Sequence, residues 1–167
     1  WHTACLRDEE KEGGSGEPMS PDIASNFAQI KDRAQSRWHD VFEGDIPIIM
    51  VGTATCGRAA GAIEVLNAIK EQLGEEHQNI PVLEVGCMGH CYAEPLVTIV
   101  KPGGEYPPIL YGYVTPEIAR LLVKDYVLGE DPSLEFMLGA LDANELLPSL
   151  TDLPRFAHEK HVLLQTC

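Results

Sequence analysis

The chain has 167 residues, a length that fits one domain of ordinary size with additional segments at its ends. Its formal net charge of −14 at pH 7 argues against nucleic acid or an anionic membrane surface as a partner. No apolar stretch approaches the ~20 residues needed to cross a bilayer, and the polar, acidic N-terminus is unlike a secretory signal. We therefore expect a cytoplasmic protein without direct membrane insertion, a location that includes the periphery of a membrane-bound complex.

The N-terminal residues divide into a tail and a helix. Residues 1–19 are polar, with four Glu and three Gly, and predict a flexible acidic tail. Ser20 is a typical N-cap with Pro21 at the first helical position, and Gly44 is a stop signal, so residues 20–44 form one unit containing a helix to about residue 41. Its apolar face is made up of Ile23, Phe27, Ile30, Ala34 and Trp38.

The next segments alternate between strand and helix patterns. Residues 46–51 predict a buried strand, and a helix follows from residue 57 or 58 until Gly74. Residues 81–85 predict a second strand. A strand, a helix and a strand in this order place the two strands parallel, with a right-handed crossover.

The remaining elements complete an α/β domain. Residues 96–100 and 108–114 predict an antiparallel hairpin, and Thr115-Pro116 opens another helix. The resulting order, β-α-β-β-β-α over residues 45–129, is that of a thioredoxin-like fold. Residues 130–167 predict a short helix over about 131–141, followed by an extended C-terminal connector.

Three cysteines lie at the predicted strand ends. Cys56 follows the first strand, and Cys87 and Cys91 follow the second. The carboxyl ends of parallel strands meet at one edge of the sheet, so we expect these thiols to converge. The loop glycines Gly52, Gly57, Gly86 and Gly89 allow close approach of the backbone.

The thiols favour metal or redox chemistry. The chain has five cysteines, an odd number that fits a disulfide framework poorly, and in a reducing compartment clustered thiols serve metal or redox sites. Iron–sulfur clusters use such loop thiolates, but a 2Fe–2S cluster takes four ligands, and these loops supply three. The open alternatives are His90 as a fourth iron ligand, a zinc site formed by His90 and the three cysteines, a thiol–disulfide enzyme without the usual C-x-x-C, and plain structural thiols.

Three motifs occur in order along the chain: 51-VGTATCGRAAGAIEVLNAI-69, 84-EVGCMGHCYAEPLVTIVKPG-103 and 111-YGYVTPEIARLLV-123. They resemble the thioredoxin-like 2Fe–2S ferredoxin domain at the N-terminus of the flavin subunit of NADH dehydrogenase and NAD-linked hydrogenase complexes. The resemblance covers about residues 45–167. Its final part, 153-LPRFAHEKHVLLQTC-167, is similar to the segment that leads into the FMN- and NADH-binding domain.

The resemblance implies a ligand set for the cluster. The family has two cysteines in each loop. The second-loop pair corresponds to Cys87 and Cys91, and Cys56 corresponds within one position to the second cysteine of the first loop. The first family cysteine falls at or near Gly52, where this chain has no thiol. The fourth ligand is therefore unidentified, and neither Cys5 nor Cys167 is an obvious replacement.

The resemblance also implies partners and an overall role. It predicts an electron-transfer domain whose partners are an FMN/NADH-binding domain and other subunits of a redox complex. The sequence contains no G-x-G-x-x-G loop and lacks an initiator methionine, so we expect a fragment or processed product that neither binds NADH nor catalyses a reaction alone. The alternative, suggested by the missing first-loop cysteine, is a cluster-free thioredoxin-like docking or structural module of the same complex.

Overall fold

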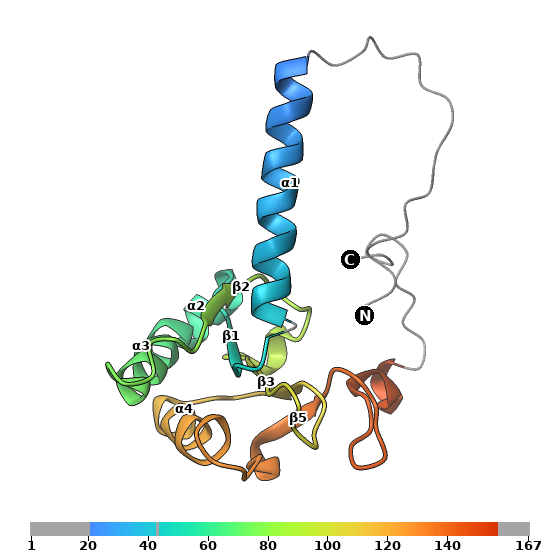
Figure 1. Cartoon of the computed structure of the whole chain (residues 1–167). Coiled ribbons are helices and arrows are strands. Elements are labelled where there is room, and N and C mark those ends of the chain that lie inside the picture. Colours follow the sequence, from blue (N-terminus) through green and yellow to red (C-terminus); the bar gives the residue numbers. More distant parts are fainter. Residues whose placement is uncertain (1–20, 43, 157–167) are drawn as a thin grey trace.

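The computed structural model describes residues 21–42 and 44–156 of the chain. A five-stranded mixed sheet with the strand order β2-β1-β3-β4-β5 forms its centre (Figure 1). The strands are β1 (Ile48–Gly52), β2 (Val82–Val85), β3 (Val97–Val100), β4 (Ile109–Tyr111) and β5 (Met137–Ala140). The helices are α1 (Pro21–Phe42), α2 (Thr55–Ala60), α3 (Ala62–Leu73) and α4 (Pro116–Leu122), which continues into a π-helical turn, η2 (Val123–Val127).

The strand pairings confirm the predicted α/β thioredoxin-like order. Strand β1 pairs in parallel with β2, and Gly52 lies opposite Val85 at the end of both strands. Strand β3 pairs antiparallel with β1, and β3 and β4 form the predicted antiparallel hairpin. At the start of α4, the Thr115 side chain accepts a hydrogen bond from the Ile118 N–H, as a helix N-cap does.

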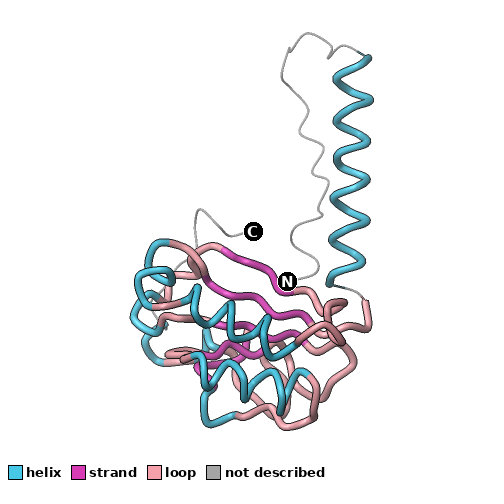
Figure 2. Tube along the Cα trace, turned by 90° about the vertical axis from the view of Figure 1, so that its left-hand side faces the viewer, coloured by secondary structure: helices cyan, strands magenta, loops and turns pink. Residues whose placement is uncertain are grey.

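Both faces of the sheet carry buried apolar side chains. Helices α3 and α4 lie together on one side of it (Figure 2) and enclose the main core. That core includes Ile49, Val51, Val65, Ile69, Ile99, Ile109 and Leu122. A smaller cluster is made up of Ala93, Leu96, Leu110 and Leu150, packed against Leu138, Leu141, Leu153 and Phe156. Residues beyond β5 therefore take part in the second cluster.

The short helix predicted over residues 131–141 is wrong. The structure has a 3-10 turn at Leu134–Phe136 and then β5, which pairs antiparallel with β4. An open strand edge leaves backbone N–H and C=O groups without hydrogen-bond partners. Strand β5 supplies these partners for β4. A Cβ at Gly139 would lie 2.6 Å from Leu150 Cδ1, so the glycine lets the chain after β5 pack directly on this strand. The sheet thus extends into the segment expected to be a connector.

The crossover from β1 to β2 contains two helices rather than the single helix that was predicted. Helix α2 begins at Thr55, and Gly61, with φ 101°, ends it before α3 begins at Ala62. A positive φ of this size suits glycine and rarely other residues. The break separates α2 from α3, and it leaves Cys56 on a short helix.

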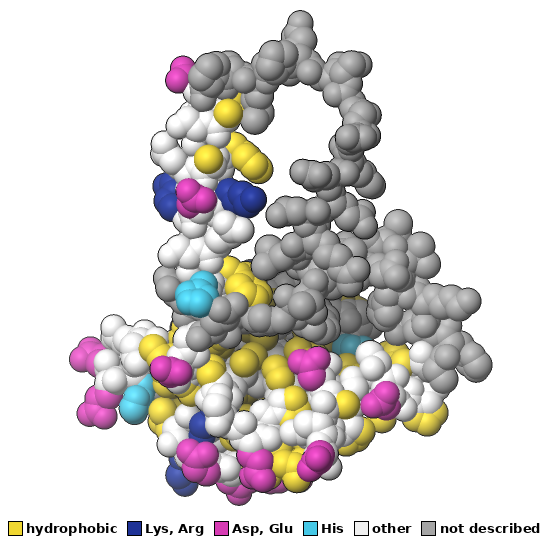
Figure 3. Space-filling model, turned by 45° about the vertical axis from the view of Figure 1, so that its right-hand side comes forward, with side chains coloured by type: hydrophobic (Ala, Val, Ile, Leu, Met, Phe, Trp, Pro, Cys, Tyr) yellow, Lys and Arg dark blue, Asp and Glu magenta, His cyan; other side chains and the backbone are white. Residues whose placement is uncertain are grey.

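Helix α1 has the predicted extent but stands away from the sheet (Figure 1). Its apolar face is open to solvent: Ile23 is 56% exposed, Phe27 61%, Ile30 58% and Trp38 44%. Figure 3 shows hydrophobic side chains in yellow on the projecting helix, beside polar and charged groups. Within the described part of the chain, the search for a helix long and apolar enough to cross a membrane finds none.

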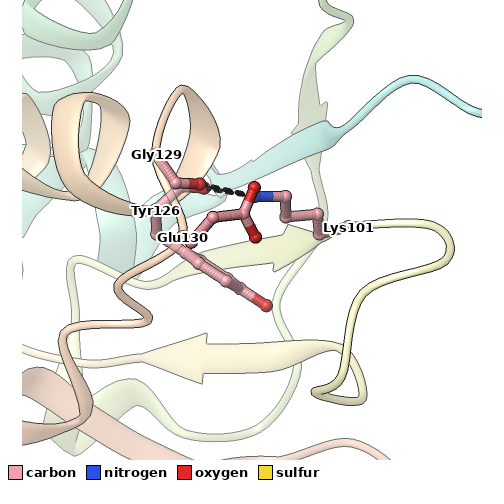
Figure 4. A network of polar contacts seen from close by, with 4 residues as sticks. All are labelled: Lys101, Tyr126, Gly129 and Glu130. Carbon is pink, nitrogen blue, oxygen red and sulfur yellow. Dashed lines mark hydrogen bonds and ion pairs between the residues drawn. The ribbon is translucent and has the colours of Figure 1, made fainter.

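Lys101, which follows β3, binds the C-terminal end of the helical segment formed by α4 and η2. Lys101 Nζ donates to the carbonyl oxygens of Tyr126 and Gly129 and lies 2.9 Å from the Glu130 carboxylate (Figure 4). The ammonium also lies 5.6 Å from the centre of the Tyr126 ring. Carbonyls at a helix C-terminus lack helical partners, so a cation there stabilises the end of the helix.

Replacing Lys101 with methionine is expected to lower the free energy of unfolding by about 1–3 kcal/mol, because two carbonyl groups lose a charged donor. Glu130→Gln is the matched control. Its side chain is 90% exposed, so loss of that ion pair should cost less than about 1 kcal/mol. Urea unfolding followed by circular dichroism measures both changes, and equal losses for the two variants would contradict this account.

Candidate functional site

The site is built on the edge where β1 and β2 end. Thr53 N–H donates to the Val85 carbonyl at 3.1 Å, which extends the parallel pairing just past the last paired residues. On the other side, Gly52 N–H donates to the Leu96 carbonyl at 3.0 Å. The loop after β1 therefore lies between the start and the end of the loop that joins β2 to β3. We call residues 52–57 the first loop and residues 86–96 the second loop.

Two thiols meet in the second loop. Cys87 Sγ and Cys91 Sγ lie 3.4 Å apart, and the Gly89 N–H donates to Cys87 Sγ at 3.4 Å. Gly89 has φ 87°, a left-handed conformation that lets the loop turn back between the cysteines. Both cysteines are exposed and unbridged. The predicted proximity of Cys87 and Cys91 is present in the structure.

Cys56 belongs to the first loop and lies in the first turn of α2. Its side chain is also exposed. Among residues 21–42 and 44–156, no group of three or more Cys, His, Asp and Glu side chains is close enough to hold a metal ion. The structure thus places Cys56 on the loop adjacent to the cysteine pair without bringing all three thiols into such a group. Cys5 and Cys167 lie outside the described residues.

Charged and aromatic side chains border the two loops. Arg58 Nε donates to the Thr53 carbonyl at 2.9 Å, and Arg58 Nη2 lies 3.5 Å from Glu84 Oε2, so this side chain bridges the first loop to β2. The His90 ring lies edge-on to Phe156, with 5.2 Å between ring centroids. The residue proposed from the sequence as an alternative iron ligand thus contacts the C-terminal segment.

Glu94 is a buried acidic residue of the second loop that the sequence did not single out. It is only 8% exposed, and its Oε2 accepts a hydrogen bond from the Leu96 N–H at 3.0 Å. Its Oε1 is fully buried and has no hydrogen-bond partner among the described residues. The sequence offered one signal, an acidic residue directly before Pro95 in the motif that carries Cys87 and Cys91.

Two glycines of the first loop border the Glu94 carboxylate. A Cβ at Gly52 would lie 3.4 and 3.6 Å from the two carboxylate oxygens, and one at Gly57 would lie 3.1 Å from Oε2. A Cβ at Gly57 would also lie 2.0 Å from the Gly52 carbonyl oxygen. The backbone at Gly52 and Gly57 is therefore packed too closely for a side chain at Gly57, and the carboxylate lies against both residues.

Comparison with curated proteins decides the family. The chain is 32% identical over 112 residues to the NADP-reducing hydrogenase subunit HndB of Solidesulfovibrio fructosivorans, and the match spans 66% of this chain and 82% of HndB. The chain belongs to the HndB family. This agrees with the resemblance to the ferredoxin-like domains of hydrogenase and NADH dehydrogenase complexes. A search against protein-family profiles finds no match.

Two solved ferredoxin structures are similar to this HndB-family chain. A thioredoxin-like 2Fe–2S ferredoxin from Aquifex aeolicus superposes with a TM-score of 0.50 at 21% identity, covering 59% of this chain and 96% of the ferredoxin. A 1.5 Å crystal structure of the wild-type ferredoxin from the same organism gives a TM-score of 0.48 at 22% identity, covering 57% of this chain and 98% of the ferredoxin. The first of these likenesses confirms the thioredoxin-like fold class.

Proposed function

We propose that the chain is an electron-transfer domain that holds a 2Fe–2S cluster through Cys56, Cys87 and Cys91. The observation that carries this proposal is the 3.4 Å separation of Cys87 Sγ and Cys91 Sγ in an exposed loop. Two sulfurs bonded at about 2.3 Å to one tetrahedral metal ion lie about 3.8 Å apart, so a small opening of the pair suits a shared iron. The donor set, three exposed thiols on adjacent loops, is chemically suited to iron–sulfur binding.

The family membership and the fold support the same proposal. HndB is named as a subunit of an NADP-reducing hydrogenase, and the Aquifex proteins are named as 2Fe–2S ferredoxins. A bound 2Fe–2S cluster supplies one-electron transfer. The residues of this chain position the ligands: β1 and β2 fix the loop ends, and Gly89 forms the turn between Cys87 and Cys91. Because these two loops lie at the surface, a partner can approach the ligands closely.

The proposed partners are the FMN- and NADH-binding domain of a flavin subunit and other subunits of a redox complex. On this proposal FMN and NADH bind to the flavin domain, and this chain passes single electrons between it and a neighbouring centre. The chain's net charge of −14 fits a protein partner better than nucleic acid. We place the assembly in the cytoplasm, where thiols remain reduced.

The proposal is tested by anaerobic reconstitution of the full chain with iron and sulfide, followed by gel filtration and metal analysis. We expect two irons and two sulfides to remain with each chain. A protein that stays folded but retains neither after desalting would overturn the cluster assignment. Circular dichroism before and after reconstitution reports the folding state.

A second candidate function is docking, and the exposed face of α1 favours it. Ile23, Phe27 and Ile30 form an exposed apolar stripe on a helix that projects from the domain, and such a stripe is unusual on a helix that stays in water. Two copies of a chain with charge −14 repel each other, so we assign the stripe to a different protein, the flavin-binding subunit of the same complex.

Docking predicts that Phe27→Asp with Ile30→Asp abolishes co-purification with a co-expressed, affinity-tagged flavin-binding subunit. Ser25→Asp with Ser36→Asp adds the same charge on the opposite face of α1 and should leave co-purification intact. Cys56→Ser should also leave it intact, because the helix rather than the cysteine site makes the contact. Unchanged co-purification of the Phe27 and Ile30 variant would exclude this role for α1.

A further inference from the structure

We propose that Cys87 and Cys91 form a reversible dithiol–disulfide pair, which a low-molecular-weight disulfide oxidises and a low-molecular-weight thiol reduces. This function goes beyond the proposed electron transfer and needs no bound cluster, because the two sulfurs alone carry it. Among the described residues, no group of three or more Cys, His, Asp and Glu side chains is close enough to hold a metal ion. The two thiols that do lie together have a redox chemistry of their own.

The two sulfurs are within reach of a covalent bond. Cys87 Sγ and Cys91 Sγ lie 3.4 Å apart, and a disulfide needs about 2 Å between its sulfur atoms. Both side chains are exposed, so rotation about their Cα–Cβ bonds can close the remaining distance without moving a neighbour in the core. Gly89, with φ 87°, turns the loop back so that the two cysteines face each other.

The loop around the pair has room for this adjustment. Apart from adjacent residues, a Cβ at Gly86 or at Gly89 would have no atom within 4 Å, so neither glycine is packed against another element. At the other end, Cys91 begins the 3-10 turn Cys91–Ala93, and Ala93 is fully buried. The loop is therefore anchored just after Cys91 and uncrowded around Cys87. Closing the disulfide needs movement only of its uncrowded part.

The exchange takes two steps. The thiolate of one cysteine attacks a small disulfide RSSR, forms a mixed disulfide with one of its sulfurs and expels the other as RS⁻. The thiolate of the second cysteine then attacks the protein sulfur of that mixed disulfide, which forms the Cys87–Cys91 bond and expels the second RS⁻. The two cysteines lose two electrons, RSSR gains them, and the two cysteine protons end on the released thiols. Cytosolic disulfides are usually transient, catalytic or redox-sensing, which suits a reversible pair at an exposed site.

The first test treats the reduced full chain with glutathione disulfide, then quenches with acid, alkylates the remaining thiols and analyses tryptic peptides by mass spectrometry. Cys87 and Cys91 fall in one tryptic peptide that contains no other cysteine. We expect this peptide to be unalkylated and lighter by two hydrogens, and dithiothreitol should restore its alkylation. A neighbouring thiol acts at a millimolar effective concentration, so at about 0.1 mM glutathione the internal disulfide should exceed glutathione adducts about tenfold. A peptide with both thiols alkylated, or with glutathione and no internal bond, would overturn the proposal.

Single variants test the two-step exchange. Cys87→Ser and Cys91→Ser each leave one thiol without its partner, so at least one of them should retain a stable glutathione adduct on this peptide. Cys56→Ser is the matched control, because it removes an exposed thiol of the first loop and should leave the yield of the internal disulfide unchanged. No adduct in either single variant, or loss of the internal disulfide in Cys56→Ser, would contradict the pairing of Cys87 with Cys91.

A third measurement connects the pair to iron binding and rests on the proposed function. Thiolate is the metal ligand, and disulfide sulfur is not. A chain oxidised at the pair before anaerobic reconstitution without added thiol should therefore lose the iron that the reduced chain retains. Equal iron in both forms would overturn this connection. Absence of iron in the reduced chain would overturn the proposed function, whereas the peptide measurement decides the disulfide pair independently.

Discussion

Replacing Gly57 with alanine is expected to destabilise the domain by more than about 3 kcal/mol, beyond the usual range for an overpacked core. The added Cβ would lie 2.0 Å from the Gly52 carbonyl oxygen and 3.1 Å from the buried Glu94 carboxylate. The first contact is with backbone, which cannot rotate away as a flexible side chain does. The first loop must therefore move away from β1 to admit a single methyl group.

Gly86→Ala is the matched control for this substitution. Gly86 belongs to the second loop, and a Cβ there would have no atom within 4 Å. Alanine at this position should change the free energy of unfolding by less than about 1 kcal/mol, as surface substitutions usually do. Urea unfolding curves of both variants measure the difference. Similar stability for Gly57→Ala and wild type would show that the first loop is not packed as described.

Replacing Cys87 and Cys91 together with serine is expected to reduce the iron retained after anaerobic reconstitution at least tenfold, since even outer-shell changes typically weaken metal affinity about 10–100-fold. The two sulfurs are 3.4 Å apart, so on our proposal both bind one iron, and their joint loss removes its thiolate ligands. Serine is close to cysteine in size, and both positions are exposed, so the fold should be retained. Iron is measured by mass spectrometry of the desalted protein.

Cys5→Ser is the control for that experiment, because it removes a thiol that the resemblance does not assign to the cluster. It should leave the iron content unchanged. Retention of full iron by the Cys87 and Cys91 double variant would contradict the assignment of the pair. Loss of iron in the Cys5 variant would show that the ligand set is wrong.

The parts of the fold that follow from local patterns could be predicted from the sequence. Apolar runs of strand length identified β1 to β4, and the strand–helix–strand order required β1 and β2 to be parallel. Thr115 followed by Pro116 identified the start of α4 through capping chemistry. Each of these signals lies within a few residues of the feature that it predicts. The proximity of Cys87 and Cys91 followed from their spacing in one loop, whereas Cys56 does not join them in a group that could hold a metal ion among the described residues.

Features that depend on distant contacts could not be predicted in this way. Residues 134–141 contain Leu, Glu, Phe and Met, which suit a helix, but the open edge of β4 selects a strand there. Likewise, nothing near Glu94 in the sequence shows that its carboxylate reaches Gly52 and Gly57, because that contact depends on how the second loop folds over the first. The absence of a first-loop thiol was visible in the sequence, whereas the carboxylate that lies beside Gly52 was not.

The most direct test of the central claim is electron paramagnetic resonance of the reconstituted full-length chain. On our account the oxidised protein absorbs visible light and gives no signal, and addition of one electron produces the signal of a reduced 2Fe–2S cluster, integrating to about one spin per two irons. A folded wild-type chain that shows neither visible absorption nor a signal after reconstitution and reduction would contradict the assignment of an electron-transfer role.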